Sequence, residues 1–160
     1  MGYFPAKEIR PGLFIGSEGD SQSPAFMTAH DIALVVNCSR NITPISMPGL
    51  QHEKINVDDS TAYNDKMLAR WPVVVREIDA VLGLGKGVLV HCRAGMQRSA
   101  ATVAAYLMYK FGLSAKDAMR TIKERKPETF WPVATFKKAL YAYELQLKAN
   151  RSANGRSSSS

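Results

Sequence analysis

The 160-residue sequence has little of what several protein classes require. It holds two cysteines, Cys38 and Cys92, which are too few for a disulfide scaffold. Its three histidines, His30, His52 and His91, show no metal-ligand spacing, so we expect neither a metal nor another cofactor. No apolar run approaches the ~20 residues of a membrane span, and the first residues lack the apolar core of a secretory signal. We therefore expect a protein of a reducing compartment, the cytoplasm or nucleus, that does not act at a membrane.

The composition that is present is that of a globular chain with a basic balance. Hydrophobic residues make up 46% and charged residues 22%, and the net charge is +7. A basic surface attracts polyanionic substrates, although it is also common on proteins with no such partner, and the sequence does not separate the two. The charge is compatible with nucleic acid, which is not favoured because no zinc-finger, RNA-recognition or helix-turn-helix pattern accompanies it.

A strand, a loop and a helix are predicted in succession at the centre of the chain. Residues 87–90 form a short apolar run typical of a buried strand. Residues 99–109 predict a buried helix with Ser99 near its N-cap. A loop that leads from a strand into a helix N-terminus directs several backbone N–H groups at one point, which favours an anion there.

The loop between them carries groups suited to phosphate chemistry. If the anion is a phosphate, Cys92 lies beneath it and the planar guanidinium of Arg98 can hold two of its oxygens. The same amides, helix dipole and guanidinium stabilise the thiolate form of Cys92, and a thiolate beneath a phosphorus atom is a nucleophile. Gly95 permits a backbone angle that a side chain would oppose in a tight cradle.

Residues 91–99 resemble the signature His-Cys-x5-Arg-Ser/Thr of the cysteine-dependent protein tyrosine phosphatase superfamily, and more narrowly the dual-specificity phosphatases. The resemblance covers roughly residues 9–148. Together with the order of strands and helices, it implies an α/β fold with a small, mostly parallel central sheet of four to five strands flanked by helices. We expect a catalytic domain over residues 1–149 and a disordered, Ser-rich tail over 150–160.

The resemblance implies catalysis through a cysteinyl-phosphate on Cys92, with a general acid in a loop about thirty residues earlier. Asp58 and Asp59 follow an aliphatic strand at that distance. The usual strand-then-Asp pattern favours Asp59, with Asp58 as the alternative. A structural alternative is that both aspartates cap the turn or helix that follows.

The remaining residues of the loop are assigned to binding and positioning. Arg98 and the backbone amides of residues 93–98 would hold the equatorial phosphate oxygens. Ser99 would donate a hydrogen bond to the departing thiolate, or cap the helix, or both. His91 is expected to orient the loop through hydrogen bonds. The predicted substrate-binding residues are His91, Arg93, Ala94, Gly95, Met96 and Gln97.

The resemblance implies a phosphatase for phosphotyrosine and for phosphoserine or phosphothreonine, with phosphorylated proteins as substrates. No segment resembles the loop that deepens the pocket of tyrosine-specific relatives. The alternatives are an RNA 5′-triphosphatase, which the charge would suit, and a phosphoinositide phosphatase, which the absence of lysine in the loop disfavours. A non-catalytic phospho-binding module is disfavoured because Cys92, Arg98 and an acid candidate are all present. The oligomeric state stays open.

Elsewhere the patterns predict further elements. These are an edge strand over 13–15, a short helix over 24–30, strands over 32–37 and 51–57, and helices over 64–84, from Ser114 to about 126, and from Phe130 onward. Pro72 marks either the true start of the helix predicted over 64–84 or a break in it. Phe130 and Trp131 either border the active site or pack in the core. Cys38 is either a buried free thiol or, under oxidation, the partner of Cys92 in a protective disulfide.

Overall fold

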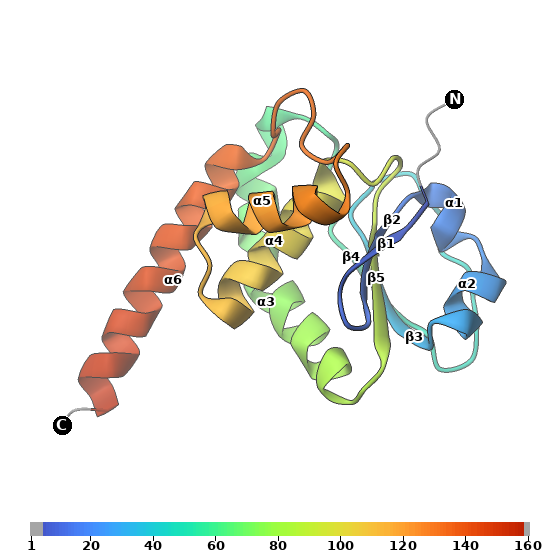
Figure 1. The fold of residues 1–160 in the computed structure, drawn as a ribbon, viewed down its shortest axis with the longest axis horizontal. Helices are drawn as coiled ribbons and strands as arrows, with labels where there is room; N and C mark the ends of the chain where they lie inside the picture. The colour runs from blue at the N-terminus through green and yellow to red at the C-terminus, as the bar shows by residue number, and fades with distance from the viewer. Residues whose placement is uncertain (1–4, 159–160) are drawn as a thin grey trace.

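The computed structural model describes residues 5–158, and within them five strands form one mixed sheet (Figure 1). In spatial order these are β1 (Lys7–Arg10), β2 (Leu13–Gly16), β5 (Gly87–His91), β3 (Ile32–Asn37) and β4 (Gln51–Lys54). β1 runs antiparallel to β2, and every other pairing is parallel. The predicted fold class, a mostly parallel sheet flanked by helices, is confirmed.

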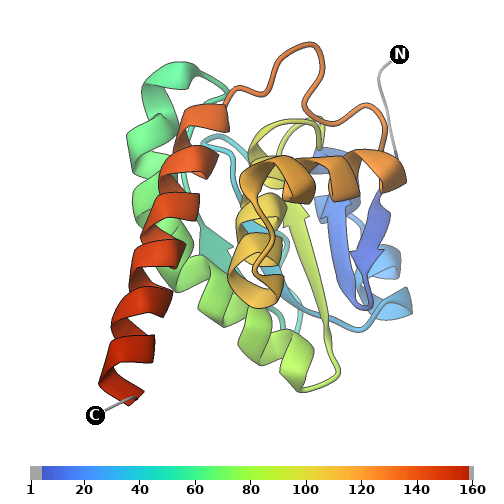
Figure 2. The ribbon, with the colours of Figure 1, turned by 60° about the vertical axis from the view of Figure 1, so that its left-hand side comes forward.

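Helices cover both faces of the sheet unequally (Figures 1 and 2). The helices are α1 (Glu18–Ser21), α2 (Pro24–Ala29), the 3-10 helix η1 (Thr61–Tyr63), α3 (Asn64–Gly83), α4 (Arg98–Phe111), α5 (Ala115–Arg125) and α6 (Lys137–Ser158). α1 and α2 lie on one side of the sheet, and α3 to α6 form the thick layer on the other. In the described part of the chain, no helix combines the length and the apolar character needed to cross a bilayer.

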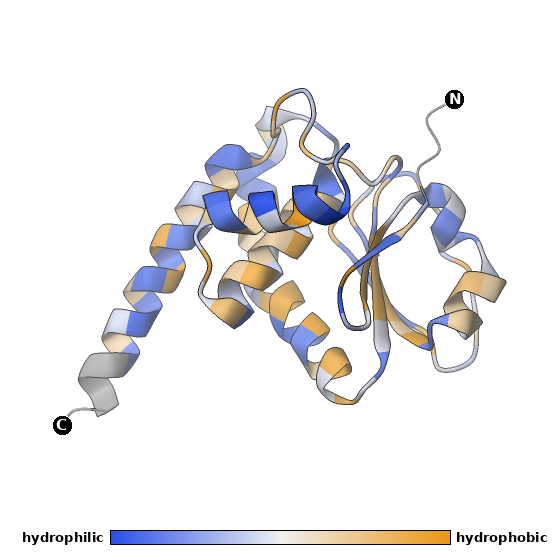
Figure 3. Cartoon of the chain, viewed as in Figure 1, coloured by the Kyte–Doolittle hydropathy of each residue, from blue (hydrophilic) through white to orange (hydrophobic). Residues whose placement is uncertain are grey.

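The strand β5 is central because both of its faces are buried. Val88 and Val90 pack in the large core under α3 to α6, whereas Leu89 packs in the smaller core under α2. Alternate side chains of a strand point to opposite faces, so a continuous apolar run is what a doubly covered strand requires. Figure 3 shows the same division, with hydrophobic colour along the sheet and α4 and hydrophilic colour along the outside of α5. Cys92 directly follows β5 and therefore lies at the carboxyl-terminal ends of the parallel strands.

Two predicted strands and one predicted break differ from the structure. Residues 13–15 lie in β2, which is not at the edge because β1 pairs outside it. β1 has one buried side chain, Ile9, in four residues, so its hydrophobic pattern is weak. Regular pairing of the strand predicted over 51–57 ends at Lys54. Pro72 lies inside α3 and neither starts nor breaks it, because buried Trp71, Val74 and Ile78 hold the helix against the core on both sides of the proline.

The last helix begins and ends later than predicted. Residues 130–136 form an irregular segment with a cis Trp131–Pro132 peptide bond, and α6 begins at Lys137. The backbone of this segment bonds to the loop after β5 instead of to itself, as described below. α6 then continues through Ser158, so the disorder predicted from residue 150 is wrong over the described residues. Arg151 ties this end down by donating to the Met108 carbonyl at 2.9 Å. Residues 1–4 and 159–160 lie outside the described residues.

Candidate active site

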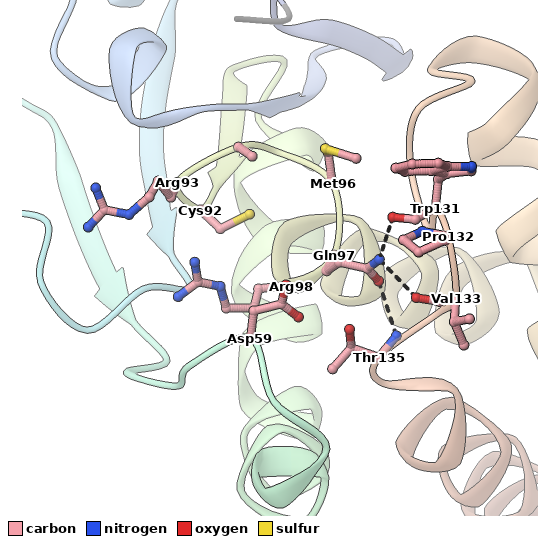
Figure 4. A pocket seen from close by; sticks show the side chains of 11 residues that line it. Asp59, Cys92, Arg93, Met96, Gln97, Arg98, Trp131, Pro132, Val133 and Thr135 are labelled. Carbon is pink, nitrogen blue, oxygen red and sulfur yellow. Dashed lines mark hydrogen bonds between the residues drawn. The ribbon is translucent and has the colours of Figure 1, made fainter. Parts of the chain in front are cut away.

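Most of the predicted loop residues line a pocket of about 470 Å³ at the carboxyl end of β5 (Figure 4). His91, Gly95 and Ser99 belong to the same strand–loop–helix unit but are not among the residues that line it. The lining residues are Asp59, Cys92, Arg93, Ala94, Met96, Gln97, Arg98, Trp131, Pro132, Val133 and Thr135. The Cys92 side chain points into this space, whereas the Arg93 guanidinium points away from it and pairs with Glu18 at 3.2 Å. The structure therefore brings together the cysteine, the arginine and one of the two candidate acids.

The sulfur of Cys92 is buried and has a hydroxyl beside it. Cys92 is 2% exposed, and its Sγ lies 3.2 Å from Ser99 Oγ. α4 begins at Arg98 with Gln97 as its N-cap, so Ser99 lies inside the first turn and is not the N-cap. Of the two roles predicted for Ser99, the geometry is therefore that of a hydrogen-bond partner for the sulfur.

Arg98 is the first residue of α4, and only part of its guanidinium has hydrogen-bond partners within the described part of the protein. One Nη1 donates to the Val57 carbonyl at 3.0 Å, which fixes the side chain against the segment that carries the aspartates. Its Nε is buried and has no hydrogen-bond partner among the described residues. A buried N–H without a partner costs free energy, and an anion in the pocket is the acceptor such a group needs.

Gly95 sets the shape of the loop. Its φ is +72°, and a Cβ built there would lie 2.8 Å from the Gly16 carbonyl oxygen and 3.5 Å from Lys126 Cε. Both the backbone angle and the close approach to β2 therefore require glycine. The Glu18 amide donates to the Arg93 carbonyl at 3.0 Å and holds the start of the loop against α1.

His91 lies beneath the loop and is 1% exposed. Burial lowers the pKa of its imidazole to about 4, with the backbone of Cys92 acting in the opposite direction. The ring is therefore neutral at pH 7. Its Nδ1 has no hydrogen-bond partner among the described residues, and the role of His91 in orienting the loop through hydrogen bonds stays a prediction.

The two aspartates have different surroundings. Asp58 binds Arg40 Nη1 at 3.0 Å, and this hydrogen bond lowers the pKa of its carboxyl. Asp59 is exposed and lines the pocket, and Asp58 is not among the lining residues. The role of Asp59 as the general acid stays a prediction. The capping alternative is wrong for both, because Ser60 is the N-cap of η1 and its Oγ accepts from the Ala62 amide at 3.2 Å.

Gln97 holds residues 130–136 against the loop, a role that the sequence analysis missed. Its Nε2 donates to the carbonyls of Trp131 and Val133 at 3.1 and 2.9 Å, and its Oε1 accepts from the Thr135 amide at 3.1 Å. The Phe130 amide also donates to the Met96 carbonyl at 2.9 Å. The side chain of Gln97 thus satisfies backbone groups that a helix would pair with one another. The signal available in the sequence was a long amide among the small and apolar residues of the loop.

The two aromatic residues of this segment have different surroundings. Phe130 is buried and belongs to the core, whereas Trp131 is 65% exposed and forms the pocket rim. Lys126, which the sequence analysis did not single out, is fully buried behind Gly95 and forms an ion pair with Glu128.

Cys38 follows β3 as Cys92 follows β5, and both are free thiols. Its Sγ lies 3.6 Å from Thr102 Oγ1. Burial, and next the proximity of Cys92, raise the pKa of the Cys38 thiol. The disulfide between the two under oxidation stays a prediction. Among the described residues, no three His, Cys, Asp or Glu side chains come together as metal ligands.

The sheet, the strand–loop–helix around Cys92 and the pocket define the phosphatase fold of the cysteine-dependent class. A family model described as the catalytic domain of dual specificity phosphatases matches residues 13–146. The chain belongs to the dual-specificity phosphatase family, as its signature predicted.

Relatives of known name agree with this family. Dual specificity protein phosphatase 1B of Arabidopsis thaliana is 31% identical over 148 residues, which cover 89% of this chain and 84% of the relative. Dual specificity protein phosphatase 8 of Mus musculus is 33% identical, over 88% of this chain and 21% of the relative. Protein phosphatase Slingshot homolog 3 of Homo sapiens is 30% identical, over 91% and 22%. The chain therefore spans about a fifth of the length of the last two relatives.

Solved structures agree as well. The crystal structure of human DUSP28 matches with a TM-score of 0.83 and 30% identity, covering 91% of this chain and 96% of that one. A human tyrosine phosphatase-like serine/threonine/tyrosine-interacting protein matches with a TM-score of 0.79 and 30% identity, covering 88% and 96%.

Proposed function

We propose that the chain hydrolyses phosphotyrosine and phosphoserine or phosphothreonine in proteins through a cysteinyl-phosphate on Cys92. The observation that carries the proposal is a buried sulfur, 3.2 Å from the Ser99 hydroxyl, in a pocket that Arg98 and Asp59 also line. The names of the relatives, dual specificity and tyrosine-protein phosphatases, support the substrate class.

In the first step the Cys92 thiolate attacks phosphorus. The S–P bond forms as the P–O bond to the substrate side chain breaks, and protonated Asp59 gives its proton to the leaving oxygen. Arg98 and the loop amides hold the remaining phosphate oxygens, where charge is concentrated in the transition state. The uncommitted Nε of Arg98 supports this assignment.

In the second step the Asp59 carboxylate takes a proton from water. The water oxygen bonds to phosphorus, the S–P bond breaks, and inorganic phosphate leaves. The Ser99 hydroxyl donates to the departing sulfur and makes it a better leaving group. His91, neutral at pH 7, takes no part in the proton transfers. A thiolate nucleophile needs reducing conditions, so we also propose a reducing compartment, the cytoplasm or nucleus, as the place of action.

Phosphate release from a substrate panel tests the proposal. The panel contains phosphotyrosyl and phosphothreonyl peptides, a phosphoinositide and triphosphorylated RNA, with Cys92→Ser as the control for contaminating activity. We expect release from both peptides and none from the control. Turnover of the RNA or the lipid without turnover of either peptide would contradict the protein substrate and favour one of the two alternatives. Tight binding of phosphopeptides with no turnover of any substrate would instead indicate a binding module.

A further inference from the structure

A second hollow of about 850 Å³ adjoins the candidate active site. We call it the α5 groove; it lies between the outer side of α5, residues 130–134 and the first turns of α6. Pro132 and Val133 line both this groove and the Cys92 pocket, so they form the ridge that the two hollows share. A chain whose phosphorylated side chain enters the Cys92 pocket would meet the α5 groove directly across that ridge.

The α5 groove is strongly basic. Four cationic side chains line it, namely Lys116, Arg120, Lys123 and Lys137, against the single carboxylate of Glu124 among the lining residues. Arg120 is partly compensated, since it pairs with Asp117 at 2.6 Å. The other three meet no carboxylate in the ion pairs of the described residues: Lys123 donates to the Thr129 carbonyl at 2.9 Å, and Lys137 lies 5.7 Å from the centroid of the Tyr141 ring.

The groove is not a uniform field of charge, because apolar side chains lie between the cations. Met119 and Ala134 are partly buried against the core, and the exposed ring of Tyr141 closes the side formed by α6. Cations around an apolar strip suit an extended polypeptide that carries both acidic and apolar side chains. In Figure 3 the α5 ribbon is largely hydrophilic in colour.

We propose that the α5 groove binds an acidic segment of the phosphoprotein substrate that flanks the phosphorylated residue. The inference rests on the proposed function and adds a substrate class to it: phosphorylation sites with Asp, Glu or a second phosphate on one side. Opposite charges raise the encounter rate and lower KM, while the chemistry at Cys92 stays the same. The advantage of acidic substrates is therefore expected to fall as the ionic strength rises.

Matched peptides and a matched variant pair test the proposal. The peptides share one phosphotyrosine and carry Glu, Ala or Lys at the flanking positions, on either the N-terminal or the C-terminal side. The test variant is Lys116→Glu/Lys137→Glu, because both side chains are exposed and neither donates a structural hydrogen bond among those of the described residues. The control variant, Arg76→Glu/Lys86→Glu, makes the same change of charge on exposed positions outside the groove. Hydrolysis of p-nitrophenyl phosphate, which fills the Cys92 pocket alone, reports on basal activity.

We expect wild type and the control variant to favour a Glu-flanked peptide over its Ala-flanked counterpart by about tenfold in kcat/KM, on one side only. The test variant should lose most of that preference, keep its activity toward p-nitrophenyl phosphate, and show little dependence on salt. Equal kcat/KM for all flanks in wild type, or an equal loss in the control variant, would overturn the inference and leave the phosphatase activity standing. Competition by single-stranded RNA but not by an unphosphorylated Glu-rich peptide would overturn it too, by assigning the groove to nucleic acid. Absence of activity toward every substrate, p-nitrophenyl phosphate included, would overturn the proposed function itself.

Discussion

The two cysteines of this chain have similar positions and opposite surroundings. Both directly follow parallel strands, Cys38 after β3 and Cys92 after β5, and both lie beside a hydroxyl of α4. After Cys92 the chain forms a loop into the N-terminus of α4, where amides and Arg98 converge. After Cys38 the chain continues to Arg40, whose guanidinium donates hydrogen bonds to Asp58 and Tyr63.

A strand end and a neighbouring hydroxyl are therefore not enough to make a cysteine a nucleophile. Cys38 is fully buried, and burial raises the pKa of its thiol. Cys92 is buried to nearly the same degree but lines a pocket with a guanidinium. In the proposed mechanism, the groups that face the Cys92 sulfur and the bound phosphate come from the loop and the helix, not from the strand.

The largest effect is expected from exchanging each sulfur for oxygen. Cys92→Ser should lower kcat for p-nitrophenyl phosphate by at least about 10⁴-fold, because a serine hydroxyl is not ionised at this site at neutral pH. Cys38→Ser should stay within about threefold of wild type, because Cys38 does not line the pocket. Steady-state kinetics of the two variants measures the difference, and comparable losses in both would break the comparison.

The paired aspartates give the next largest effect. Asp59→Asn should lower kcat for phosphopeptides by about 10²-fold, the usual contribution of a general acid. The loss should be smaller for an aryl phosphate whose leaving group needs no proton. Asp58→Asn removes the partner of Arg40 on the surface and should change kcat by less than about threefold. An inactive Asp58→Asn variant together with an active Asp59→Asn variant would assign the general acid to Asp58 instead.

The two hydroxyls of α4 that lie beside the cysteines should affect different properties. Ser99→Ala removes the donor to the Cys92 sulfur and should lower kcat by about tenfold, mainly in the breakdown of the phosphoenzyme, which a larger pre-steady-state burst would reveal. Thr102→Val leaves the Trp71 Nε1–H, which now donates to Thr102 at 3.2 Å, without its partner. It should lower the free energy of unfolding by about 2 kcal/mol with little change in kcat. Loss of activity in both variants to the same extent would show that the two sites are not separate.

The effect expected from His91 is on stability and not on kcat. Its folded-state pKa, about 4, lies below its ordinary value of 6.5. The folded state therefore binds fewer protons than the unfolded state, and stability present above about pH 6.5 is lost as the pH falls toward 4. Between pH 7 and 5 this loss amounts to about 2 kcal/mol.

The measurement is urea unfolding of wild type and His91→Gln at both pH values. Burial raises the pKa of Glu77 to about 7, which changes stability in the opposite direction over the same range. The difference between the two proteins cancels that contribution. An advantage of wild type that is the same at both pH values would contradict a buried, neutral His91.

The residues of the loop around Cys92 were easier to predict than the more distant segments that pack against this loop. Residues 91–99 are contiguous, so backbone geometry alone brings Cys92, Arg98 and Ser99 together. Gln97 acts on residues more than thirty positions away, and no local pattern contains that distance. The spacing of Val133 with Phe136 and Leu140 predicted a helix from Phe130, and this prediction is wrong. Val133 is 71% exposed, and its carbonyl accepts a hydrogen bond from Gln97 instead of from a helical amide.

Tertiary contacts also overrode local signals elsewhere. Pro72 is tolerated inside α3 because the buried residues around it hold the helix, and the polar end of α6 is anchored by Arg151. Asp59 was favoured over Asp58 as the general acid by its position after a strand, and of the two only Asp59 lines the pocket in the described part of the chain. The reason for that difference, the pairing of Asp58 with Arg40, joins residues eighteen apart and was not visible in the sequence.

Selective alkylation of the native protein compares the reactivity of Cys92 with that of Cys38. The protein is treated with iodoacetate at about pH 6, where an ordinary thiol reacts slowly, and the labelled cysteine is identified by peptide mass spectrometry. The account predicts rapid labelling of Cys92, protection by inorganic phosphate, and no labelling of Cys38. Labelling of Cys92 that is as slow as that of free cysteine at this pH, or that phosphate does not slow, would contradict it.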